Sequence, residues 1–389
     1  MIKIETKRLQ TMTSKVMKGV TFGIMPISSM IGIKVENNEL FLTATDQLNY
    51  IEVKEKVVGD DMDVAVPANL LNKLVQKTTT KDVKLTLKDN YLQFKGNGNY
   101  KLELTLDDGE HLKSPVLPDI ETADEKGQIE IKDFKEILKN NSVSLPKNND
   151  ENDAGFYFGG CYFGKEAITF DGKVASVTEI KLFKKPFLMC REALGLIDKM
   201  NSEVIKYKRE NDCLLLESEK ERVYTLELDN KELYPTETVE DFFADLKNQS
   251  SCKLVKPELL SAIDRVSIFV KEKDNRPVIL KFEEGGLKIT NKTGSSSEIL
   301  EYKNKNNIDG DAEEIAVNYE LLKSVVNVQK PEFELYFNNL DPLKFINEGT
   351  KHLLSLIDIN NQIETVEVEE ETSVPDENSD YISDEEIPF

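Results

Sequence analysis

The sequence predicts an α+β fold of three similar domains, each with two helices packed on antiparallel sheets. Its 389 residues exceed the roughly 250 to 300 that one hydrophobic core usually serves. One strand-and-turn signature also recurs three times, over residues 39–46, 166–171 and 286–291. Because the spacing is 125 residues from Asp46 to Asp171 and 120 from Asp171 to Asn291, it indicates duplication of whole domains.

The elements follow the same order in each copy. A helical pattern opens each copy, over residues 6–20, 131–145 and 256–270. A second helical pattern follows an apolar strand, over residues 67–75, 190–197 and 318–326. Apolar residues then alternate with polar ones, as in 83–87 and 333–337, which is typical of half-buried antiparallel strands.

Domain boundaries are expected where the chain becomes polar or contains proline, near 117–119 and 248–250. We therefore expect domains at 1–119, 120–249 and 250–359. Residues 360–389 hold eleven carboxylates and no Lys or Arg, so we expect a disordered acidic tail there.

Composition argues against several classes of protein. A net charge of -22 and the lack of a long apolar run argue against a membrane protein, and the first residues do not form a secretory signal, so we expect a cytoplasmic protein. The four cysteines form no CxxC pair, so we predict core thiols rather than disulfides or a zinc site. They are Cys161, Cys190, Cys213 and Cys252.

Positive charge concentrates in the predicted helices of this acidic chain. With their flanking residues, the six helical segments hold 19 Lys or Arg and 8 Asp or Glu. Such helices pack an apolar stripe on a sheet and turn their basic stripe outward. If all six basic stripes face the same side, together they form a surface that can bind the phosphates of a nucleic acid. A lysine on any exposed helix can also simply be solvated. The candidate DNA-facing residues are Lys7, Arg8, Lys15, Lys18, Lys73, Lys77, Lys135, Lys139, Arg191, Lys199, Lys256, Arg265 and Lys323.

Three motifs carry a resemblance to a known family. They are Leu42-Thr43-Ala44-Thr45-Asp46 in the first copy, residues 170–175 in the second, and 272–278 with 286–290 in the third. With them, residues 1 to about 358 resemble the bacterial DNA polymerase III beta subunit, the sliding clamp, or a phage relative. The resemblance implies a DNA clamp fold and a head-to-tail homodimer. Six domains would form a ring around double-stranded DNA and hold DNA polymerase and a clamp loader on it, without reading sequence.

The resemblance also implies two protein-binding surfaces. An apolar pocket between the second and third domains would accept a partner peptide at Phe158, Gly172, Lys173, Val174, Pro235, Val239, Leu354 and Leu356. Subunit contacts would lie at Phe269 and Val270, against the strand of residues 101–106, including Leu104, in the next copy.

The last six residues are similar to the acidic tip of bacterial single-stranded DNA-binding protein. That resemblance implies docking of Ile387, Pro388 and Phe389, with the terminal carboxylate, into basic-rimmed clefts of partner proteins. A solvated tail is the simplest alternative. A third hypothesis is autoinhibition, in which the tail visits the basic channel or the peptide pocket.

Nothing in the sequence indicates an enzyme or a cofactor. His111 and His352 lie in loop or strand patterns, and no phosphate-loop, dinucleotide-binding or HExxH motif is present. The tip favours a rival function, a single-stranded DNA-binding or replication accessory protein, but the chain has no Trp for base stacking. A structural protein that keeps only the clamp fold is a further alternative.

Overall fold

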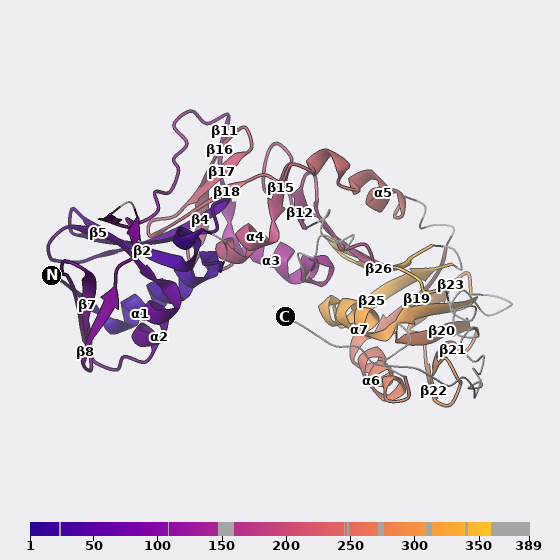
Figure 1. The fold of residues 1–389 in the computed structure, drawn as a ribbon. Helices are drawn as coiled ribbons and strands as arrows, with labels where there is room; N and C mark the ends of the chain where they lie inside the picture. Colours follow the sequence, from indigo (N-terminus) through magenta and orange to yellow (C-terminus); the bar gives the residue numbers. More distant parts are fainter. Residues whose placement is uncertain are drawn as a thin grey trace, which may run out of the picture.

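One order of elements occurs three times along the chain: strand, helix, three strands, strand, helix, three strands, with one extra short strand (β23, Asn304–Asn306) in the third copy. The computed structural model describes residues 1–22, 25–107, 109–146, 159–244, 246, 249–270, 276–308, 313–338 and 341–358. The predicted boundaries at 119 and 249 fall between repeats of this order, and the three repeats follow one another along an arc (Figure 1). The threefold duplication predicted from sequence is therefore present in the fold.

The first repeat runs from β1 to β10. Its helix α1 buries Leu9, Met12 and Val16 against the sheets, which explains why the apolar residues fall at helical spacing. The elements are β1 (Ile2–Glu5), α1 (Thr6–Val16), η1 (Met17–Gly19), η2 (Pro26–Ser29), β2 (Met30–Glu36), β3 (Glu39–Thr45), β4 (Asn49–Lys56), β5 (Met62–Pro67), α2 (Ala68–Gln76), β6 (Asp82–Leu87), β7 (Tyr91–Lys95), β8 (Asn99–Glu103), β9 (Leu106–Asp107) and β10 (Glu110–His111).

The second repeat adds a short helix, α5, that the sequence patterns did not predict. Val239 of α5 is buried and packs with Tyr234 on the face of β12, β13 and β14. The elements are β11 (Glu125–Glu130), α3 (Ile131–Asn141), η3 (Ser142–Ser144), β12 (Gly160–Phe163), β13 (Ala167–Phe170), β14 (Val174–Thr178), β15 (Phe187–Cys190), α4 (Arg191–Ile197), β16 (Val204–Glu210), β17 (Cys213–Glu217), β18 (Glu221–Leu226), η5 (Lys231–Leu233) and α5 (Thr236–Asp241).

The third repeat has its own core, in which Phe282 stacks on Phe337. Its elements are β19 (Ser250–Val255), α6 (Lys256–Ser267), β20 (Pro277–Glu283), β21 (Gly286–Asn291), β22 (Ser297–Leu300), β23 (Asn304–Asn306), β24 (Glu313–Asn318), α7 (Tyr319–Val328), β25 (Glu332–Phe337), β26 (Leu343–Asn347) and β27 (Thr350–Leu354). Cys161, Cys190 and Cys252 are buried as predicted, whereas Cys213 is half-buried.

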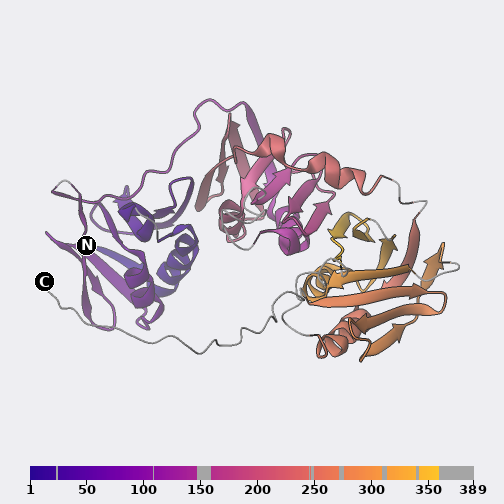
Figure 2. The same ribbon diagram turned by 45° about the vertical axis from the view of Figure 1, so that its right-hand side comes forward.

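Antiparallel strand pairing joins the three repeats. Strand β18 pairs with β4 to form an eight-stranded sheet, and β14 pairs with β27 to form a nine-stranded sheet. The outer four-stranded sheets, β1-β6-β7-β8 and β22-β21-β20-β24, lie at the two ends of the arc (Figure 2). The sheets therefore continue across both domain junctions.

The repeated sequence signature ends in a turn capped by an Asp or Asn side chain in every copy, and the turn is longer in the third. The carboxylate of Asp46 accepts hydrogen bonds from the backbone N–H groups of Leu48 (3.0 Å) and Asn49 (2.7 Å). Asp171 caps the turn between β13 and β14 in the same way, and the Asn291 side-chain oxygen accepts from the N–H of Ser296 (3.1 Å). Asp and Asn recur here because their short side chains can satisfy turn N–H groups that the sheet leaves unpaired.

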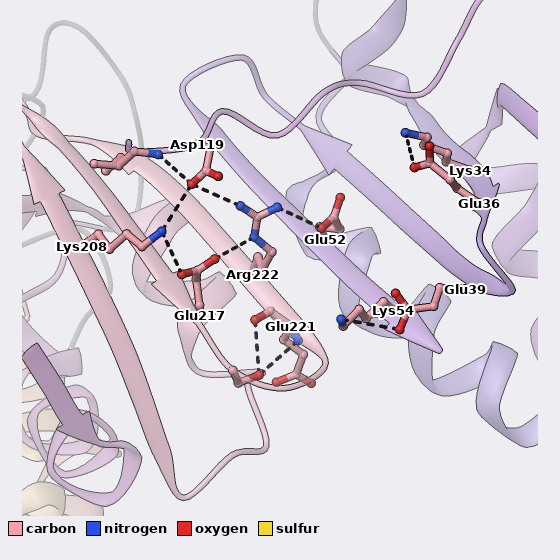
Figure 3. Close-up of polar contacts among 12 residues, drawn as sticks. Lys34, Glu36, Glu39, Glu52, Lys54, Asp119, Lys208, Glu217, Glu221 and Arg222 are labelled. Atoms are coloured by element: carbon pink, nitrogen blue, oxygen red, sulfur yellow. Dashed lines mark hydrogen bonds and ion pairs between the residues drawn. The ribbon is translucent and has the colours of Figure 1, made fainter. Parts of the chain in front are cut away.

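A network of charged side chains crosses the first junction (Figure 3). The Arg222 guanidinium on β18 lies 3.1 Å from Glu217, 3.6 Å from Asp119 and 3.5 Å from Glu52 on β4. Burial raises the pKa of Glu52, although Arg222 opposes this shift. Arg222 therefore links the first repeat to the second by charge as well as by backbone pairing.

A buried histidine bridges the second junction. His352 on β27 has no exposed surface, and its ring Nε2 lies 3.0 Å from the carbonyl oxygen of Asn140 on α3. Because a carbonyl only accepts, Nε2 carries the proton. Nδ1 then accepts a hydrogen bond from the Gln329 amide (3.1 Å), which also donates to the carbonyl of Val325 (2.8 Å). The neutral ring fits this site, because a proton added at Nδ1 would point at the N–H donor of the Gln329 amide.

We predict that acid weakens this junction. Burial lowers the pKa of His352 to about 4, below the roughly 6.5 of an unfolded histidine. The stability contributed by the neutral ring is therefore present above pH ~6.5 and falls as the pH drops toward 4, by roughly 3 kcal/mol in total. Urea unfolding between pH 7 and pH 4 measures this loss.

The matched control is His352→Gln, which cannot titrate. This variant is expected to be less stable at neutral pH, but with a shallower decline toward acid. An unchanged difference between wild type and variant at every pH would contradict the prediction.

Candidate nucleic-acid interface

The helices of the three repeats face the same side of the arc. In two views, α1, α2, α3, α4, α6 and α7 lie along the concave side, and the long sheets lie along the convex side (Figures 1 and 2). Each helix buries apolar residues in the core, so its polar stripe lies on the side away from the sheets. The expectation that these stripes converge on one space fits this arrangement.

Most of the predicted basic residues are exposed on or beside these helices. In the first repeat they are Lys7, Arg8, Lys18, Lys73 and Lys77. In the second they are Lys135, Lys139, Arg191 and Lys199. Arg265 is also exposed, but its guanidinium contacts Glu298. Lys15, Lys256 and Lys323 are half-buried and have close partners within the fold. The exposed groups of Arg191, Arg8 and Lys199 lie near Pro146, Glu5 and Asp198, respectively.

Helices α1 and α2 pack side by side through two glutamines. The Gln10 amide donates to the carbonyls of Val75 and Thr78, both at 3.1 Å. The Gln76 amide donates to the carbonyl of Gln10 (3.1 Å) and to the hydroxyl of Ser14 (2.9 Å). These reciprocal bonds hold the lysines of both helices on one surface.

A hollow of about 770 Å³ lies where this surface meets the second repeat. Donors on one side come from α1, and Asp198 to Asn201 close the other side. Its lining consists of Lys7, Gln10, Thr11, Ser14, Lys15, Gln76, Asp198, Lys199 and Asn201. Hydroxyl, amide and ammonium groups of this kind are the usual donors to phosphate oxygens.

Lys15 has a structural partner that sequence alone could not reveal. Its ammonium pairs with Glu221, and only 13% of the Lys15 side chain and 5% of the Glu221 side chain are exposed. The other Glu221 oxygen accepts the N–H of Asn201 (3.0 Å). Lys15 therefore joins the first repeat to the second, and an incoming anion would have to displace a buried carboxylate.

In the third repeat, the predicted basic residues are held by neighbouring groups. The guanidinium of Arg265 donates two 2.6 Å hydrogen bonds to Glu298, which lower the pKa of that carboxyl. Lys323 lies 2.5 Å from Asp264 on the adjacent helix. The Lys256 ammonium donates to the carbonyls of Asn327 (2.6 Å) and Gln329 (3.1 Å), where α7 ends.

The predicted peptide pocket is only partly at the surface. Val174 and Leu354 face each other in the β14–β27 pairing and are 1% and 0% exposed, so they belong to the core of the third repeat. Val239 is also buried, whereas Lys173 follows the turn at Gly172, whose φ of 87° suits glycine. Pro235 and Leu356 are half-buried, and Phe158 lies outside the described residues.

A hollow of about 560 Å³ lies beside these positions, between α5 and the third repeat. The residues that line this hollow were not predicted from the sequence, because α5 was not predicted. The spacing of Val239 and Phe242, three residues apart, is the signal that could have indicated this helix. The lining residues are Thr238, Asp241, Phe242, Gln249, Asn338, Asp341 and Lys344. The buried Lys344 ammonium lies 3.2 Å from Asp341, and the Gln249 side-chain oxygen is buried without a hydrogen-bond partner among the described residues.

The two ends of the arc expose apolar side chains. Phe269 is 55% exposed and Ile299, on β22, is 62% exposed. Leu106, on β9, is 60% exposed at the other end. Of the predicted interface residues, Phe269 is thus accessible, whereas Val270 and Leu104 are half-buried against the cores of their own repeats.

The part of the chain that the structure describes holds no cluster of three or more His, Cys, Asp or Glu able to bind a metal. Within the same residues, every helix is too short or too polar to cross a bilayer. His111 lies on β10 and His352 is the buried bridge described above.

Solved structures share this architecture from end to end. The DNA polymerase III beta subunit of Thermotoga maritima superposes with a TM-score of 0.77 at 15% identity, over 92% of this chain and 100% of that one. A putative beta subunit from Eubacterium rectale gives 0.77 at 21% identity, over 92% and 99%. The sliding clamp of Caulobacter crescentus, with polyethylene glycol bound to a putative tethering region, gives 0.77 at 19%, again over 92% and 99%. This chain has the sliding-clamp fold.

Sequence comparison supports the same relationship in one region. Residues 246–357 match the family of the DNA polymerase III beta subunit, C-terminal domain. No curated protein matches the chain by sequence. The first two domains thus resemble sliding clamps in fold, and the third resembles them in both fold and sequence.

Within this clamp fold, we predict that Lys256 stabilises the protein rather than binding DNA. Lys256→Met keeps the apolar stem and removes the hydrogen bonds to Asn327 and Gln329, so we expect a loss of about 1–3 kcal/mol in the free energy of unfolding. Urea unfolding measures this loss, and the affinity for duplex DNA should change less than twofold.

Lys253→Met is the matched control, because the ammonium of Lys253 lies in an exposed ion pair with Glu332, at 2.7 Å. Because solvent screens an exposed pair of this kind, Lys253→Met should unfold much as the wild type does. Equal destabilisation by the two variants would show that Lys256 has no special role.

Proposed function

We propose that this chain is a sliding clamp, a non-enzymatic ring of two copies that encircles duplex DNA and tethers DNA polymerase and other replication proteins to it. The supporting observation is the pattern of strand pairing. Each repeat contains two sets of three consecutive strands, and the last strand of each set lies at the edge of that set. These six last strands are β4, β8, β14, β18, β22 and β27. Four of them pair across the two internal junctions, and within the described residues β8 and β22 have a neighbour on one side only.

The two internal junctions suggest how a ring would close. In each, the last strand of the first set in one repeat meets the last strand of the second set in another: β4 meets β18, and β14 meets β27. The equivalent third pair is β22 with β8, which lie at opposite ends of the arc (Figure 2). One chain leaves both edges unpaired, so the third junction requires a second copy in head-to-tail orientation.

The concave helices support a duplex as the enclosed ligand. They carry exposed lysines on a protein of net charge -22, so positive charge faces the space the ring would enclose although the chain as a whole is acidic. Contacts to phosphate carry no sequence information, and a ring held only by such contacts can slide. The same proposal assigns the protein to the cytoplasm.

Partner proteins would bind beside α5. The hollow lined by Phe242, Lys344 and Gln249 combines an apolar surface with hydrogen-bonding groups, which suits a short peptide with apolar anchor residues. The tethering region named for the Caulobacter crescentus clamp supports an attachment site of this kind. A polymerase and a clamp loader are the partners we propose for it.

The tail tip is assigned from its sequence alone, because Ile387, Pro388 and Phe389 lie outside the described residues. We retain docking of this tip into partner proteins as part of the proposal. The alternative function, single-stranded DNA binding, draws its support from the tip alone. Many of the described aromatic side chains, including Phe94, Phe134 and Phe345, are buried in domain cores rather than arranged as stacking surfaces.

The decisive experiment compares DNA topologies. The protein is first bound to a duplex with open ends, and both ends are then blocked with streptavidin. The protein should stay bound through a high-salt wash, because a closed ring cannot slide off. Cutting the same duplex with a restriction enzyme should release the protein, because a ring then reaches a free end. Equal retention before and after cutting would contradict encirclement, and preference for a single strand would favour the alternative.

Closure through β22 predicts that a charged residue at this edge breaks the dimer. Ile299→Asp should shift the mass measured by light scattering from dimer to monomer and abolish retention on the blocked duplex. Val116→Asp is the control, because Val116 is 84% exposed and lies in the segment between β10 and β11. A monomeric wild type, or an Ile299→Asp variant that stays dimeric, would count against this closure.

A further inference from the structure

Charge on the concave side is unevenly divided among the three repeats. Helices α1 and α2 of the first repeat have four basic residues and no acidic one, and Lys18 and Lys77 follow just after them. In the third repeat, α6 and α7 have three basic and three acidic residues. The second repeat lies between these extremes, since Asp133 and Glu136 accompany the lysines of α3. Most of the concave positive charge therefore belongs to the first repeat.

Side-chain partners sharpen this difference. Lys7, Lys18, Lys73 and Lys77 are exposed, and none of them forms an ion pair within the residues that the structure describes. On α6 and α7, by contrast, Arg265 and Lys323 already contact carboxylates, and Lys256 is bound to backbone carbonyls. The first repeat thus presents four accessible ammonium groups.

The accessible groups also have suitable neighbours. Exposed positions between the lysines of α1 carry Thr11 and Ser14, and Asn72 lies beside Lys73 on α2. These side chains can donate hydrogen bonds and carry no charge that repels phosphate. On α6, Asp264 and Glu258 are exposed, so a phosphate approaching that surface meets negative charge.

An ammonium group gains most from phosphate when it has no other anionic partner. Binding then releases the counterions of the DNA, whereas a paired cation must first give up its carboxylate. The lysines of the first repeat meet this condition, and Arg265 and Lys323 do not.

We propose that Lys7, Lys18, Lys73 and Lys77 supply most of the contact with the DNA backbone, and that α6 and α7 supply little. This inference rests on the proposed clamp function. In a ring with twofold symmetry, the two copies of the first repeat lie across the hole from each other. The duplex would then be held from two opposite sides, with nearly neutral walls between them.

The test compares two double variants with equal loss of charge. Lys73→Gln with Lys77→Gln removes two accessible lysines. Lys323→Gln with Lys330→Gln removes two lysines that face carboxylates, since Lys330 lies 3.3 Å from Glu348. Affinity for a short duplex is measured by fluorescence anisotropy over a salt series, on the full chain.

We expect the first variant to bind roughly tenfold more weakly at low salt, with a slope of log affinity against log salt reduced by about 0.9 for each phosphate that is no longer neutralised. The second variant should change affinity less than twofold. Lys73→Arg with Lys77→Arg should restore binding, because the charge is kept, and thermal melting checks that all variants are folded.

Equal weakening by both glutamine variants, or greater weakening by the α7 variant, would overturn the inference. Wild-type protein that fails retention on the blocked duplex, while the first variant still weakens binding to the short duplex, would refute the ring and leave this surface supported. A wild type that binds no duplex would overturn both.

Discussion

Antiparallel pairing between edge strands organises the whole molecule. Strands β4 and β18 meet at one junction, and β14 and β27 meet at the other, so the sheets of neighbouring repeats become continuous. Backbone hydrogen bonds across each junction fix the register and leave little freedom in the angle between repeats. The helices lie on the same side of the arc because each repeat meets the next through equivalent strands. The position of the basic side chains is therefore a consequence of the sheets.

Each junction also contains polar groups that must be satisfied when buried. At the first, Lys15 and Glu221 are largely hidden from water and neutralise each other. At the second, His352 links the Asn140 carbonyl to Gln329. Such contacts add only modestly to stability when made, but leaving one partner unpaired is costly, so they favour one arrangement of the repeats.

The sequence allowed much of the fold to be predicted, for a physical reason. Asp46, Asp171 and Asn291 recur because each side chain accepts a backbone N–H in the turn that ends the signature, although the turn at Asn291 is longer. Helical periodicity located the six concave helices because their apolar stripes face a core. The six-residue helix α5 was missed, since so short a segment carries little periodic signal.

The candidate site was harder to predict, because accessibility depends on contacts distant in sequence. Lys15 looked like its neighbours on α1, yet its partner Glu221 lies 206 residues away. Val174 and Leu354 matched pocket positions but face each other inside a sheet that forms only when two repeats meet. The sequence shows which helices are basic. Only the fold shows which of their lysines are accessible and which already contact a carboxylate or carbonyl group.

The unpaired edges have a mechanical consequence for a closed ring. At both internal junctions the polypeptide itself continues from one repeat to the next, so a separated joint stays tethered and can re-form. No chain would cross between β22 of one copy and β8 of another. A separated seam between two copies is therefore not held together by the chain, so in such a ring it would re-form more slowly than either internal junction.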